Sequence, residues 1–169
     1  MTEAELRKLE AEYCSWGDAV HSAEPPKMLA RCEGCFLYDS QGTAYLDLQM
    51  ASATASFGYR NDRLNQTLKA QLDRLPQLGS HYLHSEKIEV SARLAQLCER
   101  IFGKKGRIHF NVGGATAIED AVKLARNYTH KSAGFAFMGG YHGRTLGATA
   151  ITSSYRYRRR YGHFGDRAH

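Results

Sequence analysis

Two adjacent glycines, placed between a β-prone run and a helical repeat, constrain the fold of this chain more than any other feature. They stand in the stretch NVGGATAIEDAVKLAR, which runs from Asn111 to Arg126. Gly113 and Gly114 allow a tight turn and a close approach of the backbone to a ligand. The first N–H groups of the following helix have no partner inside the helix, and such a helix start binds anions, often phosphates. The same glycines would also suit a tight strand-to-helix connection without a ligand, and the local sequence leaves both interpretations open.

The segments around this turn predict an α/β arrangement. RIHFN (Arg107–Asn111) and GFAFM (Gly134–Met138) have the composition of short strands, and the helix between them is expected to run through Tyr128. A strand, a helix and a second strand at this spacing form a βαβ unit with two parallel strands. A second glycine-rich turn, GGYHGRT (Gly139–Thr145), follows the second strand. Because ligands of open α/β sheets collect at the carboxyl ends of the strands, both turns are expected at the binding edge.

The two turns also bear on which phosphate compound would bind. The dinucleotide pattern GxGxxG and the GK[ST] ending of a P-loop are both absent, which argues against a nicotinamide cofactor and a nucleoside triphosphate. Tyr141 lies among glycines, and a large aromatic side chain beside a phosphate site can lie flat on a planar ring. His142 and Arg144 add polar and cationic groups to the same turn. The spacing is equally consistent with Tyr141 as a core aromatic residue that covers the strand end.

The first hundred residues have a different character and predict an α+β arm. Leu6, Leu9 and Tyr13 share one helical face, and Asn61 is a suitable N-cap for a helix that carries Leu64. Turn residues between two β-rich runs predict a hairpin. The expected elements are helices over Thr2–Trp16, from Asn61 to Leu75 and over Ser85–Phe102, hairpin strands over Cys35–Tyr38 and Ala44–Leu48, and a loop over Met50–Gly58.

The stretches NVGGATAIEDAVKLARNYT and GFAFMGGYHGRTLGATAITSS, in that order, resemble the class III aminotransferases of the ornithine, acetylornithine and 4-aminobutyrate type. The upstream segment GCFLYDSQGTAYLDLQMASATASFGYRND resembles the hairpin of the same family. The resemblance implies an α/β fold, the aspartate-aminotransferase-like fold type I, with pyridoxal 5′-phosphate (PLP) as cofactor. It implies transfer of an amino group from an amino acid or amine to a 2-oxo acid. Residues 1–102 would then be an N-terminal helical and hairpin segment, and residues 103–169 the start of the PLP-binding large domain.

The resemblance also implies roles for individual residues. Gly114 and Ala115 stand where the family offers backbone N–H groups to the PLP phosphate, and Thr116 completes this turn in place of an acidic residue. Tyr141 stands where an aromatic side chain stacks on the pyridine ring. Ser52 lies near the place of an aromatic residue in the loop that lines the substrate side. The small residues of that loop leave the substrate open, with ornithine, acetylornithine, 4-aminobutyrate and diamines as candidates.

No lysine of this chain matches the family's catalytic lysine, which forms a Schiff base with PLP. Lys104, Lys105 and Lys123 lie in no matching motif, and the family's lysine and its pyridinium-pairing aspartate lie downstream, beyond the length of this chain. We therefore assign no catalytic residue. We expect the N-terminal portion of an enzyme that is inactive alone, needs a complementary C-terminal segment or subunit, and forms a homodimer or larger assembly. A racemase or decarboxylase of the same fold and a non-catalytic truncated paralogue are the alternatives.

Composition and charge argue against several other classes of function. No run approaches the ~20 apolar residues of a membrane span, and the N-terminus lacks the apolar core of a signal peptide, which predicts a cytoplasmic protein without membrane contact. Cys32 and Cys35 form a single CxxC with no second pair, so no metal site is expected. Five arginines fall in the tail SYRYRRRYGHFGDRAH. No nucleic-acid recognition fold accompanies this tail, and no nucleic-acid partner is predicted.

Overall fold

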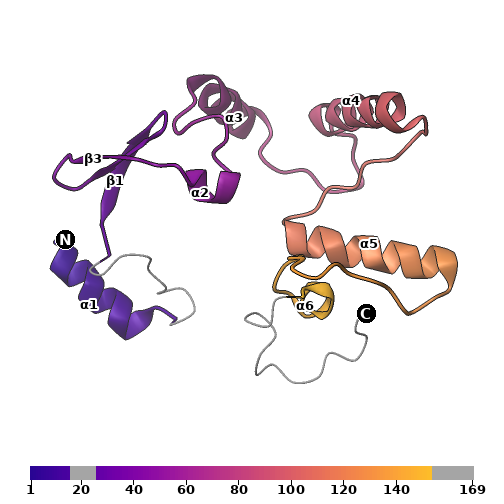
Figure 1. Cartoon of the computed structure of the whole chain (residues 1–169). Helices are drawn as coiled ribbons and strands as arrows, with labels where there is room; N and C mark the ends of the chain where they lie inside the picture. Colours follow the sequence, from indigo (N-terminus) through magenta and orange to yellow (C-terminus); the bar gives the residue numbers. More distant parts are fainter. Residues whose placement is uncertain (16–25, 154–169) are drawn as a thin grey trace. The chain divides into compact units, whose positions relative to one another are not determined.

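The chain divides into two units, residues 1–82 and residues 83–169, and each is described here by itself. The computed structural model describes residues 1–15 and 26–153, whose helices and strands are labelled in Figure 1. The expected helix end at Trp16 and the arginine-rich tail lie outside the described residues. The division at residue 102 that the sequence suggests stays a prediction.

The first helix of the N-terminal unit, α1 (Glu3–Tyr13), confirms the predicted amphipathic segment. It begins with a capping box, in which the Thr2 hydroxyl accepts the Glu5 N–H at 3.2 Å and the Glu5 carboxylate accepts the Thr2 N–H at 2.7 Å. This reciprocal pair satisfies two backbone donors that a helix start otherwise leaves without a partner.

An antiparallel sheet follows, with strands in the order β1 (Leu29–Glu33), β2 (Phe36–Asp39) and β3 (Ala44–Leu46). The hairpin of β2 and β3 confirms the sequence-based prediction, whereas β1 was not predicted. Arg and Glu interrupt the short run LARCE, and four of its five residues are exposed, so the run lacks the alternation of a half-buried strand. Its pairing with β2 at Cys32 and Leu37, rather than its own pattern, makes it a strand.

The segment after β3 differs from the predicted loop, because it contains a short left-handed turn, α2 (Met50–Ala53). The φ angles of its four residues lie between 50° and 68°, in the region that non-glycine residues rarely adopt. The carboxylate of Asp47 accepts the N–H groups of Gln49 at 2.9 Å and Met50 at 3.1 Å, and the hydroxyl of Tyr59 at 2.5 Å. One acidic side chain therefore anchors both ends of the segment that contains the turn.

The two remaining helices before the glycine turns agree with the sequence. Helix α3 (Asp62–Arg74) begins at the predicted N-cap Asn61, whose side chain accepts the Leu64 N–H at 3.2 Å. Helix α4 (Ser85–Phe102), in the second unit, has the predicted bounds and ends at Gly103, which adopts the left-handed conformation common after helices.

The second unit continues with α5 (Gly114–Thr129) and ends its described part with α6 (Leu146–Ile151). Helix α5 confirms the predicted helix after the glycine pair. The described residues of this unit that are fully or almost fully removed from solvent belong to α6, its C-terminal end and the loop before it: Gly143, Ala148, Thr149, Ala150 and Thr152. The packing of α6 on α5 therefore forms the small core beside the glycine turns, and Figure 1 shows the two helices next to each other.

The predicted βαβ unit is wrong in one respect: residues 107–111 and 134–138 are not strands in the described structure. A strand requires a hydrogen-bonded neighbour, and these two segments pair neither with each other nor with another described segment. Phe135 and Phe137 accordingly remain 94% and 89% exposed. β-propensity thus marks segments that can pair, whereas pairing itself depends on a partner.

The described helices include none that is both long enough and apolar enough to cross a membrane.

Candidate functional site

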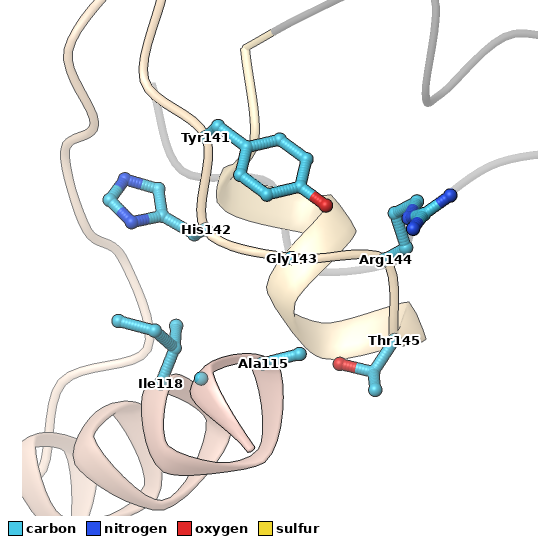
Figure 2. Close-up of a pocket in the computed structure, with 8 residues that line it drawn as sticks. Ala115, Ile118, Tyr141, His142, Gly143, Arg144 and Thr145 are labelled. Carbon is cyan, nitrogen blue, oxygen red and sulfur yellow. The ribbon is translucent and has the colours of Figure 1, made fainter. Parts of the chain in front are cut away.

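A pocket of about 630 Å³ opens between the start of α5 and the glycine-rich loop that leads to α6. Figure 2 shows Ala115 and Ile118 on α5 facing the loop that carries Tyr141 and His142. The residues that line the pocket are Gly114, Ala115, Ile118, Tyr141, His142, Gly143, Arg144 and Thr145. The two glycine turns of the sequence therefore meet at one site, as predicted, although no paired strands carry them there.

The start of α5 presents a set of free backbone donors. The first N–H group that bonds within the helix is that of Ala117, which donates to the Gly113 carbonyl at 3.0 Å. The N–H groups of Gly114, Ala115 and Thr116 have no hydrogen-bond partner in the described part of the chain. A Cβ atom on Gly113 or Gly114 would meet nothing within 4 Å, so open space lies beside these donors. Gly113 is extended, with φ −176°, so its contribution is access rather than an unusual backbone conformation.

Thr116 contributes through its backbone rather than through its hydroxyl. Its Oγ1 donates to the Gly113 carbonyl at 2.8 Å, one turn back along the helix start. That bond uses the hydroxyl proton, so the group of Thr116 that remains available as a donor is its backbone N–H.

Tyr141 lies across the pocket from α5, as Figure 2 shows, and keeps 54% of its surface exposed. Its ring is therefore not a buried core aromatic, which was the alternative interpretation. The sequence-predicted residues Gly114, Ala115 and Tyr141 all line the same pocket, and Thr116 follows them directly in α5.

The loop comes so close to α5 that only glycine fits at its centre. Gly143 has φ +124°, and a Cβ built on it would lie 2.4 Å from the Cβ of Ala115. At the base of the loop, the fully buried Thr152 accepts the His142 N–H at 3.1 Å, and its Oγ1 lies 3.1 Å from the Gly143 carbonyl. These contacts fix the backbone on both sides of Gly143.

Sequence reasoning did not assign a role to Glu119, which joins α5 to the loop and α6. Its Oε1 accepts the Gly147 N–H at 3.0 Å, across 28 residues of sequence. The Thr145 hydroxyl lowers the pKa of Glu119; burial raises it, and the N–H groups of Gly147 and Ala148 lower it further, so that the net direction is downward. Glu119 follows Ala115 by four residues and so shares its helical face, which is the sequence signal that could have identified it.

A second acidic residue of α5, Asp120, makes a separate set of contacts. It interacts with His109 at 3.2 Å, Asn111 at 2.5 Å and Lys123 at 3.3 Å. Hydrogen bonds from His109 and Lys123 lower the pKa of Asp120. Lys123 is exposed and pairs with this carboxylate rather than lining the pocket.

Ser52, the substrate-side candidate, belongs to the first unit. It lies in the left-handed turn α2 with φ 59°. The structure thus places four of the five sequence-predicted residues around one helix start and the fifth in a separate strained turn.

Comparisons with known proteins complete the description of this site. Residues 19–169 match the family description "Aminotransferase class-III". The acetylornithine aminotransferase of Archaeoglobus fulgidus is 35% identical over 132 residues, which cover 78% of this chain and 34% of that protein. The alanine/serine racemase of Pyrococcus horikoshii is 31% identical over 129 residues, which cover 76% of this chain and 27% of that protein. The chain therefore spans roughly a quarter to a third of the length of these relatives.

A solved structure gives the corresponding structural comparison. The taurine:2-oxoglutarate aminotransferase of Bifidobacterium kashiwanohense, in complex with PLP and glutamate, matches 94% of this chain and 35% of its own, with a TM-score of 0.81 and 24% identity. At that identity the likeness concerns the fold.

Proposed function

The chain belongs to the class III aminotransferases, and from this premise we propose that the pocket at the start of α5 binds PLP. The family and the α/β fold expected from the sequence are both confirmed. The observation that carries the proposal is that a helix start with three free N–H groups, two of them on the pocket-lining residues Gly114 and Ala115, meets an exposed aromatic ring at a single pocket. A phosphorylated planar ring is the ligand that uses both.

The phosphate would lie at the start of α5. Gly114, Ala115 and Thr116 supply N–H donors, and the open space beside Gly113 and Gly114 admits a dianion without displacing a side chain. The helix dipole adds to the attraction, typically by 0.3–1 kcal/mol and by more in partly buried sites. This is a site for a phosphate held by backbone groups.

The ring would lie against Tyr141. An aromatic pair in offset contact contributes about 0.5–1.5 kcal/mol beyond the area that it buries. The loop geometry around Gly143 keeps Tyr141 on the side of the pocket opposite α5. The roles of this chain's residues are therefore to hold the phosphate and to orient the ring.

The activity that we propose for the whole protein is amino-group transfer from an amino acid or amine to a 2-oxo acid. When bound, PLP supplies an electron sink and an aldehyde that carries the amino group. The names of the related aminotransferases support this reaction. A complete site also needs a lysine that holds the aldehyde, and no lysine of this chain lies in the family's motif for it. We propose that a complementary polypeptide segment supplies it.

Ser52 is our proposed substrate-side residue. Four consecutive non-glycine residues with positive φ store strain, and strain of this kind is concentrated at functional sites. Asp47 and Tyr59 hold the segment in this conformation. The resemblance of this segment to the family's substrate-side loop supports the assignment.

The assembly that we propose contains the complementary segment and a second copy of the protein. Unpaired, exposed apolar segments such as Phe135–Met138 support a partner that adds strands beside them. The homodimer rests on the family resemblance. The cytoplasmic location, which we also propose, rests on the sequence, in which no run approaches the ~20 apolar residues of a membrane span.

Racemisation is the second candidate reaction, because a related racemase matches 76% of this chain. A nitrogen-15-labelled amino donor separates the two reactions. Label in the amino acid formed from the 2-oxo acid supports transfer, whereas inverted donor that keeps its label supports racemisation and contradicts the transfer proposal.

The binding proposal is tested by equilibrium dialysis of the protein against PLP and against pyridoxal, which lacks the phosphate. We expect PLP to bind at least tenfold more tightly, because charge-assisted bonds to three N–H groups are lost with pyridoxal. Equal affinity for the two compounds, or no binding of PLP, would contradict a phosphate site at the start of α5.

A further inference from the structure

Glu119 makes a contact that brings α5 and the start of α6 unusually close together. Its Oε1 accepts the N–H of Gly147 at 3.0 Å. A Cβ built on Gly147 would lie 2.9 Å from both Cδ and Oε1 of Glu119, so a side chain at residue 147 would displace the carboxylate. The backbone of α6 therefore lies so close to this carboxylate that residue 147 has no room for a side chain.

The surroundings of the carboxylate favour its charged form. The Thr145 hydroxyl, whose oxygen is buried but makes no bond of regular hydrogen-bond geometry, lies beside it, and backbone N–H groups at the start of α6 face it. The negative charge of Asp120 on the same helix acts in the other direction and raises the pKa of Glu119. Helix α6 itself carries no titratable side chain. Glu119 is thus a charged acceptor directed at the junction of the loop and α6.

This junction determines where the loop lies over α5. Thr152 and Ser153 tie the loop to the end of α6, through the His142 N–H at 3.1 Å and the Gly140 carbonyl at 3.0 Å. The loop and α6 therefore form one piece, and the Glu119–Gly147 bond attaches this piece to α5. Because Tyr141 lies on the piece and the free N–H groups lie on α5, the bond sets the distance between them.

We propose that Glu119 is a positioning residue, which fixes the Tyr141 loop over the start of α5 so that one ligand contacts both. The consequence for PLP rests on the proposed function. The attachment of the loop does not, because it concerns contacts within this chain. Glu119 is not among the residues that line the pocket, so it acts through Gly147 and the loop.

The first measurement is amide hydrogen exchange of the full chain without PLP, in Glu119→Ala, in Glu119→Gln and in the control Asp120→Ala. We expect Glu119→Ala to increase exchange at residues 140–147 roughly tenfold, since a hydrogen bond to a charged group is lost. Glu119→Gln keeps an oxygen acceptor and should restore most of the protection. Asp120→Ala removes contacts to His109, Asn111 and Lys123. In this control the exchange rates of residues 140–147 should stay within twofold of the wild-type rates. Unchanged exchange in Glu119→Ala, with α5 intact, would overturn the proposal.

The second measurement compares PLP with inorganic phosphate by equilibrium dialysis. Phosphate uses the donors of α5 alone, so Glu119→Ala should leave its affinity within twofold, whereas the PLP affinity should fall roughly tenfold as the ring contact is lost. Equal losses for both ligands would show a general structural role and contradict positioning. If the wild-type protein binds neither ligand, the proposed function fails, and the exchange result still decides whether Glu119 positions the loop.

Discussion

Ala115 and Gly143 are in contact so close that a single added methyl group would not fit between them: a Cβ on Gly143 would lie 2.4 Å from the Cβ and 2.9 Å from the Cα of Ala115. One residue belongs to the helix start with the free N–H groups, and the other to the loop that carries Tyr141. Both residues line the pocket. The site therefore depends on glycine at residue 143 for two reasons, its positive φ of +124° and the absence of a side chain.

Gly143→Ala is expected to destabilise the second unit by about 3 kcal/mol, because the substitution adds backbone strain to overpacking. The measurement is urea unfolding, monitored through the amide hydrogen exchange of α6. Gly42→Ala is the matched control: Gly42 also has a positive φ, of +89°, but a Cβ there would meet nothing within 4 Å. The control should lose about 1 kcal/mol of unfolding free energy, from backbone strain alone. Equal losses in the two variants would contradict the steric part of this prediction.

Tyr141→Ala is expected to weaken PLP binding by roughly tenfold, whereas Tyr141→Phe should stay within twofold, because stacking needs the ring and not the hydroxyl. Lys123→Ala is the control on the same unit, since Lys123 is exposed and pairs with Asp120. Equilibrium dialysis of the three variants against PLP provides the comparison. Equal PLP affinity in Tyr141→Ala and Lys123→Ala would be incompatible with a ring that lies on Tyr141.

Local signals predicted the helices well, and the reason is that a helix satisfies its own backbone. Helix α4 begins and ends at the predicted residues, and Asn61 caps α3 as its side-chain chemistry indicates. The strands depend on neighbours instead. Residues 107–111 have a strand composition but no partner among the described residues, and β1 has a weak pattern but pairs with β2. Sequence periodicity contains the first kind of information and not the second.

The site shows the same division between local and long-range information. The donors of α5 follow from the glycine pair and the helix after it, both of which are local. The Glu119–Gly147 bond and the Ala115–Gly143 contact each join residues 28 positions apart, and the sequence does not state which residues meet. The left-handed turn at Ser52 was also missed, because no glycine or asparagine marks it.

Ala51→Gly is expected to stabilise the first unit by roughly 1 kcal/mol, because glycine adopts a left-handed conformation without a steric penalty. Ala51 has φ 50° and ψ 50°, within the turn that contains Ser52. Ala70→Gly, in the exposed interior of α3, should destabilise by about 1 kcal/mol, because there glycine replaces the best helix former. Urea unfolding of both variants checks the opposite signs. Destabilisation by both substitutions would show that the turn is not strained.

The stability of the first unit in acid is expected to depend on Asp47. The Tyr59 hydroxyl and the N–H groups of Gln49 and Met50 lower the pKa of Asp47 below its ordinary value of 3.8. A carboxyl whose pKa is lower in the folded state stabilises the fold above its ordinary pKa, and this contribution is lost as the pH falls through the folded-state value. Tyr59→Phe removes the largest of these hydrogen bonds, so the pKa of Asp47 should rise toward 3.8 and the loss of stability in acid should become smaller.

Tyr45→Phe provides the matched control for this pH dependence, because Tyr45 donates to a different carboxylate, that of Asp39, at 2.9 Å. Burial raises the pKa of Asp39, but hydrogen bonds from Thr43, Tyr45 and Gln41 lower it by more. NMR titration of the two carboxyl carbons distinguishes the variants. Tyr59→Phe should move only the Asp47 titration and Tyr45→Phe only that of Asp39. A rise of the Asp47 pKa in Tyr45→Phe, or none in Tyr59→Phe, would mean that the hydroxyl of Tyr59 does not hold this carboxylate in its charged form.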